Sequence, residues 1–160
     1  MPYPDDLLEQ AFGLIHKEPN RPKQASLRRA ISTAYYALFH LLIREAAGNW
    51  RQVSSRIVIV RGFEHGIMKA ASLRVGNARL FPFTGEDPAV VSSLRQVGHT
   101  FAKLQEQRHI ADYDTVTTWT RTEALDLVHA AEAAFTAWRT IRKERIARDF
   151  LASLLVKKRD

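Results

Sequence analysis

Apolar residues recur at three- and four-residue spacing along most of the chain, which is the pattern of amphipathic helices. The first such run covers residues 7–15, behind the negative charges of Asp5 and Asp6, and it stops before Pro19. The second run extends from about residue 22 toward residue 50 and has no glycine or proline until its last turn. This stretch predicts the longest and most apolar helix of the protein.

The middle of the chain is less regular. The stretch "SSRIVIV" (residues 54–60) is rich in β-branched residues, but no second alternating run is present to pair with a strand, so we expect a helix or a loop. A third helix is expected over about residues 62–74, ended by the turn residues Gly76 and Asn77. Residues 79–88 contain the prolines and the glycine of a loop.

Capping residues mark two further helices. Asp87 and Pro88 suit the N-cap and the first position of a fourth helix, and Thr120 or Thr122 suits the N-cap of a fifth. Four or five long helices joined by short connections predict an all-α fold, an antiparallel up-and-down bundle in which each apolar stripe is buried against its neighbours.

An amphipathic segment continues beyond the fifth helix. We expect a single domain over residues 1–160, with its core at about residues 5–142 and a C-terminal helical extension at residues 143–156. The apolar face of the extension predicts a homodimer or a larger oligomer, with folding back onto its own bundle as the alternative. The apolar residues of this face are Ile146, Phe150, Leu151, Leu154 and Leu155.

The net charge of +7 favours polyanionic partners, because a basic surface binds phosphate backbones with release of counterions. Basic residues cluster between Arg21 and Arg29 and between Arg139 and Arg148. The two clusters make one positive face if they meet in space, and otherwise they solvate helix surfaces. The chain has no cysteine, which excludes thiolate chemistry and fits a cytoplasmic location, and no export signal or membrane span is visible, so no membrane partner is expected.

An arginine occupies the apolar face of the predicted fourth helix. At about 100° per residue, Arg108 falls in the same sector as the apolar residues from Val90 to Leu104. Asp112 follows one turn later, close enough for an ion pair, and Tyr113 adds a hydroxyl on an apolar ring. An inward-facing charge pair predicts a binding or catalytic site, with a structural ion pair as the alternative.

The longest predicted helix carries polar side chains along one sector of its surface. Each alone fits a hydrogen-bonded core residue, whereas together they favour a groove. The four are Arg29, Ser32, Tyr36 and His40. His65 and Lys69, one turn apart in the third helix, are further candidates. No pair of histidines has metal-ligand spacing and no glycine-rich loop suits a phosphate, so we expect neither a metal nor a cofactor.

Four segments occur in order along residues 22–142: "RRAISTAYYALFHLL", "FEHGIMKAA", "RHIADYD" and "TEALDLVHAAEAAF". Together they resemble the HEPN superfamily of small helical domains, and most of all its bacterial branch with an A-Y-Y-A-x-F-H helix and a downstream R-x-x-A-D-Y. This resemblance implies an antiparallel bundle, frequent dimerisation and roles around RNA or nucleotides. Those roles include toxin–antitoxin and defence systems, in which some members are metal-independent ribonucleases.

The resemblance also implies which residues carry the chemistry. Catalytic HEPN members have an arginine and a histidine separated by about four to six residues, a pair that polarises a phosphate and moves a proton. That spacing is missing here, because Arg108 is followed directly by His109. The pairs Arg61–His65 and Arg95–His99 each enclose only three residues. With Arg108 as the phosphate-binding group, a proton-transfer group is sought nearby, with His65 as a contributor from a facing helix. The catalytic candidates are Arg108, Asp112, Tyr113 and His40.

We therefore expect an RNA- or nucleotide-associated HEPN-like binding module, a component of a toxin–antitoxin type of system. One alternative is a divergent metal-independent endoribonuclease, and another is a non-catalytic dimerisation partner of a nucleotidyltransferase-like protein. The expected phosphate-binding residues are Arg28, Arg29, Ser32, Tyr36, His40, His65, Lys69 and Arg108.

Overall fold

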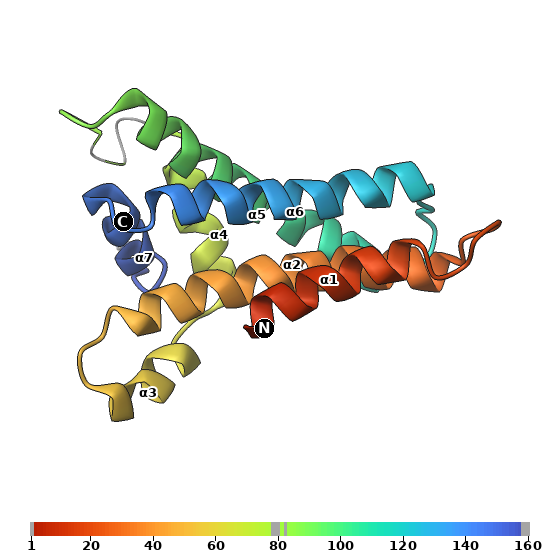
Figure 1. Cartoon of the computed structure of the whole chain (residues 1–160), viewed down its shortest axis with the longest axis horizontal. Helices are drawn as coiled ribbons and strands as arrows, with labels where there is room; N and C mark the ends of the chain where they lie inside the picture. The colour runs from red at the N-terminus through yellow and green to blue at the C-terminus, as the bar shows by residue number, and fades with distance from the viewer. Residues whose placement is uncertain (1, 78–80, 82, 158–160) are drawn as a thin grey trace.

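The computed structural model describes residues 2–77, 81 and 83–157, and helices joined by turns make up this part of the chain (Figure 1). It contains no strand, so the predicted all-α class is confirmed. Within the same residues no helix has both the length and the apolar character needed to cross a membrane. The elements are α1 (Tyr3–Ile15), α2 (Gln24–Gly48), the 3-10 turn η1 (Val53–Ser55), α3 (Arg56–Arg61), α4 (His65–Arg74), α5 (Pro88–Tyr113), α6 (Arg121–Ile141) and α7 (Arg145–Ser153).

The long helices α1, α2, α5 and α6 run antiparallel to their chain neighbours. Tyr3 at the start of α1 lies beside His40 late in α2, with ring centroids 5.0 Å apart. Asp5 at the same end of α1 pairs with Arg139 near the end of α6, so α1 and α6 are antiparallel as well. α5 and α6 are joined by the short connection 114–120. This up-and-down arrangement buries the apolar stripe of each long helix against its neighbours.

α2 is the central helix, because it contacts α1, α5 and α6 along its length and α3 and α7 at its end (Figure 1). The predicted stripe is buried, as Leu27, Ile31 and Leu38 show, but Phe39 and Ile43, roughly 100–140° around the helix from it, are buried too. Burial around most of its circumference explains why α2 is apolar nearly all round. Each fully buried large side chain contributes about 1.5–3 kcal/mol relative to exposure.

The helix boundaries follow local capping chemistry. The Asp87 carboxylate accepts a hydrogen bond from the Ala89 backbone N–H (2.8 Å), and the Thr120 hydroxyl accepts one from the Glu123 N–H (3.1 Å). Thr120 rather than Thr122 is therefore the N-cap of α6.

In two segments in the middle of the chain, the helices differ in detail from those predicted. Residues 54–60 are helical, in η1 and α3, rather than a loop. The expected third helix starts at His65 and not at residue 62, because Glu64 has an extended backbone (φ −121°, ψ 133°). Of the loop expected at 79–88, residues 79, 80 and 82 lie outside the described residues.

The C-terminal extension is a separate short helix that folds back. Glu144 has an extended backbone (ψ 147°), so the chain turns after α6 and α7 begins at Arg145. Ile146, Phe150 and Leu154 are buried within the chain, where α7 contacts α2 and α4. The apolar face that suggested a partner chain is thus largely covered by the protein's own bundle.

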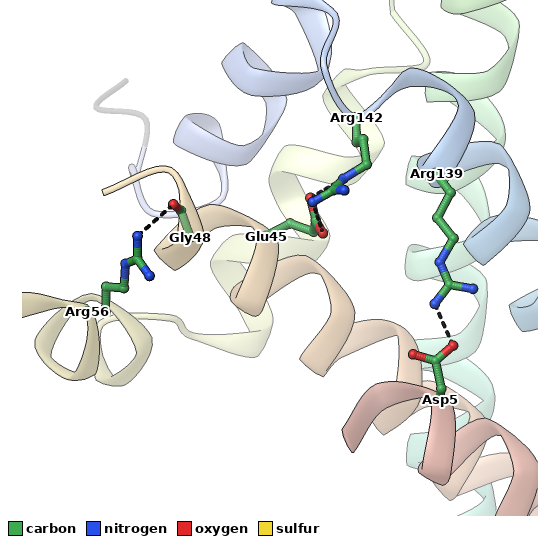
Figure 2. A network of polar contacts seen from close by, with 6 residues as sticks. All are labelled: Asp5, Glu45, Gly48, Arg56, Arg139 and Arg142. Carbon is green, nitrogen blue, oxygen red and sulfur yellow. Dashed lines mark hydrogen bonds and ion pairs between the residues drawn. The ribbon is translucent and has the colours of Figure 1, made fainter. Parts of the chain in front are cut away.

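Ion pairs fasten the end of α6 to α1 and α2 (Figure 2). Arg142 donates two hydrogen bonds to the Glu45 carboxylate, at 3.0 and 2.9 Å, and Arg139 lies 2.5 Å from the Asp5 carboxylate. Arg145 is also paired with carboxylates. Most of the second basic cluster therefore neutralises acidic side chains of the same chain.

The two basic clusters do not meet in space. The first precedes and begins α2, while the second adjoins Glu45 near the other end of the same helix (Figure 1). At about 1.5 Å per residue, Arg28 and Glu45 are roughly 25 Å apart along the axis. A single positive face built from both clusters is thereby excluded.

Candidate functional site

The Arg108 side chain lies in the α2–α5 interface and is 12% exposed. Its guanidinium carbon sits 5.1 Å from the ring centroid of Tyr35 and 5.8 Å from that of Tyr36. The prediction that this arginine turns inward is confirmed. Two aromatic faces hold the planar cation in a cation–π arrangement, which is stronger where water is excluded.

Arg108 is incompletely paired by its own chain. Its Nη1 lies 3.7 Å from Oδ2 of Asp112, one turn later, as predicted. Its Nε is buried and has no hydrogen-bond partner among the described residues. A guanidinium has five N–H donors, so one long ion pair leaves hydrogen-bonding capacity for an incoming acceptor.

Tyr35 connects α2 to the start of α4. This side chain is fully buried, and its hydroxyl shares a hydrogen bond with Nδ1 of His65 at 2.5 Å. Burial raises the pKa of the Tyr35 hydroxyl far above its ordinary value, with Arg108 opposing the change. The phenol is therefore neutral, and it fixes the position of the histidine ring from one side.

The imidazole of His65 is fixed by stacking as well. Its ring lies on the ring of Phe39, with centroids 4.4 Å apart. The pKa of His65 is lowered, first by burial and then by the positive charge of Arg108. His65 is thus a neutral base beside a cation at pH 7.

His40 lies one turn after Tyr36 on α2, with its ring 5.0 Å from the ring of Tyr3. Its pKa is also lowered, first by burial and then by His65. Two neutral imidazoles, one from α2 and one from α4, therefore lie near each other, and their protonation is coupled because a proton on one disfavours a proton on the other.

The polar edge of the site lies between the N-terminal half of α2 and the end of α5. The Ser32 hydroxyl donates to Oδ2 of Asp112 at 3.3 Å, the same oxygen that faces Arg108. This contact also shows that α2 and α5 are antiparallel. Asp112 is held by a hydroxyl and a cation, yet its side chain is 30% exposed and remains in contact with water.

A hollow of about 430 Å³ adjoins Arg108 on the surface of α5. Lys69 of α4 lines it and pairs with Glu106 of α5 at 3.0 Å. Oε1 of Gln105, another lining residue, is buried and has no hydrogen-bond partner among the described residues. The hollow thus has a cationic edge on the Arg108 side and a bridging ion pair on the other. Its lining residues are Lys69, Gln105, Glu106, Arg108, His109 and Ile110.

Arg28 has a structural role, because its guanidinium is bound to backbone carbonyl groups of the same chain. Its Nη1 donates to the carbonyl oxygen of Ala111 (3.0 Å) and also to that of Asp114, and its Nη2 donates to that of Thr117 (2.5 Å). The guanidinium also lies 5.2 Å from the ring centroid of Trp119. These contacts provide hydrogen bonds to carbonyl groups at the end of α5 and in the α5–α6 connection. Arg28 is therefore not available to a ligand in this conformation.

Tyr113 and Arg29 are also outside the cluster. Tyr113 is 68% exposed and its ring lies 5.0 Å from that of His109, on the outer face of α5. Arg29 is exposed on α2. The expected residues that the structure brings together are Ser32, Tyr36, His40, His65, Arg108 and Asp112, with Lys69 at the edge of the hollow.

Tyr35 and Phe39 are the residues that sequence reasoning did not select. Both lie in the "AYYALFH" motif, but the predicted polar sector of this helix contains Tyr36 and His40 instead. The four-residue spacing of Tyr35 and Phe39 was the available signal, because such a pair forms one aromatic surface on a helix.

No group of three or more histidine, cysteine, aspartate or glutamate side chains in the described part of the chain is placed to hold a metal ion. The chain matches no family model, no curated protein and no solved structure. The likeness to HEPN domains therefore depends on its motif residues alone.

Proposed function

We propose that this protein binds the phosphate of an RNA or a nucleotide at Arg108. The observation that carries the proposal is a guanidinium stacked against two tyrosines and held by one long ion pair (3.7 Å), at the edge of a hollow. A guanidinium held in one orientation forms bidentate bonds to phosphate and loses little conformational freedom on binding.

Three further features support this function. The net charge of +7 promotes association with a polyanion. The rings of Tyr36 and His40 are partly exposed; Tyr36 lies beside the cation and His40 lies beside Tyr36, so an unpaired base can stack on them. The resemblance to HEPN domains implies RNA or nucleotide ligands, in systems that include toxin–antitoxin pairs.

The test is RNA binding by an Arg108→Gln variant, which keeps a polar side chain and removes the charge. We expect binding of a fluorescent single-stranded RNA to weaken about tenfold. The slope of log affinity against log salt concentration should decrease in magnitude by about one. Arg21→Gln removes the same charge from an exposed position before α2 and serves as the matched control. A lower melting temperature with unchanged RNA affinity would show that Arg108 is only a structural tie to Asp112.

A second candidate, a metal-independent ribonuclease, is favoured by two histidines of lowered pKa, His65 near Arg108 and His40 near His65. A neutral imidazole accepts the proton of the RNA 2′-hydroxyl as its oxygen attacks phosphorus. The imidazolium formed in this way gives its proton to the departing 5′-oxygen, while Arg108 stabilises the charge on the phosphoryl oxygens.

This candidate is tested by RNA degradation in the presence of EDTA. Cleavage that survives chelation and is lost in His65→Gln supports the ribonuclease. Salt-sensitive binding without cleavage supports the binding module, and neither binding nor cleavage contradicts both.

The oligomeric state remains a prediction. The resemblance implies a homodimer, but α7 uses most of its apolar residues within the chain, so a dimer requires another face. Mass measurement by light scattering across a range of concentrations tests this point.

A further inference from the structure

An apolar surface lies at the end of α2, away from the Arg108 site. Trp50 is 50% exposed, and Val53, Ile57 and Val58 are also exposed. None of the six residues of α3 is buried, although four of them are aliphatic. In Figure 1, α3 lies at the periphery of the bundle, below the end of α2. Burying apolar side chains is the main reason that a short helix forms in water. The exposed aliphatic side chains of α3 therefore favour a partner that covers them.

This surface continues into a groove of about 560 Å³ between α2, α3 and α7. Its walls are apolar, apart from Arg148, Asn49 and backbone groups. The lining residues are Ala46, Gly48, Asn49, Trp50, Ile59, Arg148, Leu151, Ala152 and Leu155.

The walls of the groove are held in place. Arg56 of α3 donates to the carbonyl oxygen of Gly48 at 3.1 Å (Figure 2). It also donates to that of Trp50 at 3.0 Å, and the two bonds fasten α3 to the end of α2. A Cβ added at Gly62 would lie 3.5 Å from Cδ2 of Leu155, so the end of α3 touches the end of α7. The groove is therefore preformed, which lowers the entropic cost of binding.

Positive charge without a carboxylate partner surrounds the groove. Arg148 lines it, and exposed Arg51 and Arg61 flank the apolar stretch from Trp50 to α3. In the described part of the chain no carboxylate oxygen lies within ion-pair distance of these three, in contrast to Arg139, Arg142 and Arg145 nearby in the sequence. An occupant with both an apolar face and carboxylates complements this surface.

We propose that the groove binds an acidic amphipathic helix of a partner protein. Apolar side chains at helical spacing enter between Trp50, Ile59 and Leu155, and flanking carboxylates face Arg51, Arg61 and Arg148. This interaction does not depend on the RNA proposal, because the groove adjoins the last turn of α2 and the two residues after it, whereas Arg108 contacts Tyr35 and Tyr36.

The charge pattern favours this occupant over two others. A second copy docked symmetrically through the same face brings like-charged arginines together. A lipid surface presents a plane of phosphates, which matches the arginines but leaves a concave, walled groove unfilled. A helix fills the groove and neutralises the arginines at once.

Trp50 provides a local reporter for the test. It is the half-exposed indole, whereas Trp119 and Trp138 are buried, so acrylamide quenching reports mainly on the groove. The probe is a synthetic helical peptide of about 14 residues, roughly four turns, with leucines at i, i+3, i+4 and i+7 and glutamates on both flanks. A peptide with lysines in place of the glutamates is its control.

With the intact protein, the acidic peptide is expected to shift Trp50 emission to shorter wavelength and to reduce quenching several-fold. Trp50→Phe should remove this response. Arg148→Glu should weaken the acidic peptide about tenfold, whereas Lys17→Glu, the same charge change at an exposed position after α1, should leave binding within about twofold.

Three results with the peptides and vesicles overturn the proposal, and a fourth concerns the protein alone. They are no response of Trp50 to the acidic peptide, an equal response to both peptides, and a response only to vesicles of phosphatidylglycerol and phosphatidylcholine in equal parts. A concentration-dependent change of Trp50 emission without peptide, together with doubling of the mass, assigns the groove to a second copy and also overturns it.

Discussion

The approach of α4 to α5 at Gly98 sets the spacing between the helices that carry His65 and Arg108. A Cβ added at Gly98 would lie 2.8 Å from the carbonyl oxygen of Ser72 and 3.4 Å from Cβ of Val75. The first distance is shorter than real Cβ contacts, and its partner is backbone, so α4 must move outward to relieve it. Gly98→Ala therefore tests whether this close approach is a structural requirement.

The expected magnitude is the sum of two opposing effects. Alanine inside a helix is favoured over glycine by about 1 kcal/mol. Forcing an extra methyl group into a packed interface costs about 1–3 kcal/mol. The net loss should be about 1 kcal/mol, which lowers the melting temperature of a chain of this size by about 2–4 °C.

Gly13 supplies the matched control, because it is an exposed glycine within α1 and nothing lies within 4 Å of its added Cβ. Gly13→Ala should raise the free energy of unfolding by up to about 1 kcal/mol. The two variants should thus move in opposite directions in urea unfolding followed by circular dichroism. Equal stabilisation of both would refute the inference that Gly98 is needed for helix contact. A displaced α4 should also weaken RNA binding, because His65 moves with it.

Three other substitutions or conditions test the cap, the buried phenol and the histidines. Asp87→Ala should lower the free energy of unfolding by about 1 kcal/mol in urea titration, because the Ala89 N–H loses its acceptor, and an unchanged value would contradict this cap. Tyr35→Phe should cost about 1 kcal/mol by the same measurement, since it removes the bond to His65, and an accompanying rise in the NMR-measured His65 pKa would show that the phenol fixes the neutral ring. His40 and His65 have lowered pKa values in the folded protein, so the unfolded chain binds protons more readily. The free energy of unfolding should therefore be highest above about pH 7 and should decrease as the pH drops below about 6.5. Melting temperatures between about pH 8 and 5 check this, and His65→Gln should reduce the slope, whereas a slope unchanged by the substitution would place its origin elsewhere.

Much of the architecture is predictable from sequence because helix formation is local. Spacing of apolar residues locates the long helices, and the Asp87 cap identifies the start of α5. The Arg108–Asp112 pair is equally local, since residues four apart on one helix face each other. The turn between α6 and α7 was missed because residues 142–144 contain neither glycine nor proline.

The parts of the site that could not be predicted depend on contacts between distant segments. Nothing in the sequence near Tyr35 indicates that its hydroxyl meets His65 across the α2–α4 contact. Arg28 appeared to be a free cation, because its acceptors are backbone carbonyls, which every residue has and no motif reveals. Tyr113 was placed with Asp112, but one residue further along a helix turns the side chain by about 100°, out of the cluster.

The contacts of Arg28 have a consequence for folding kinetics. They join the second turn of α2 to carbonyl groups 83 and 89 residues later in the chain. Closing so long a loop is entropically costly, and contacts within and between adjacent helices form sooner. We infer that this arginine docks after the rate-limiting barrier to folding, so that its loss mainly accelerates unfolding and leaves the refolding rate nearly unaltered. The connection between α5 and α6 would then be the first place where the native protein opens to a protease.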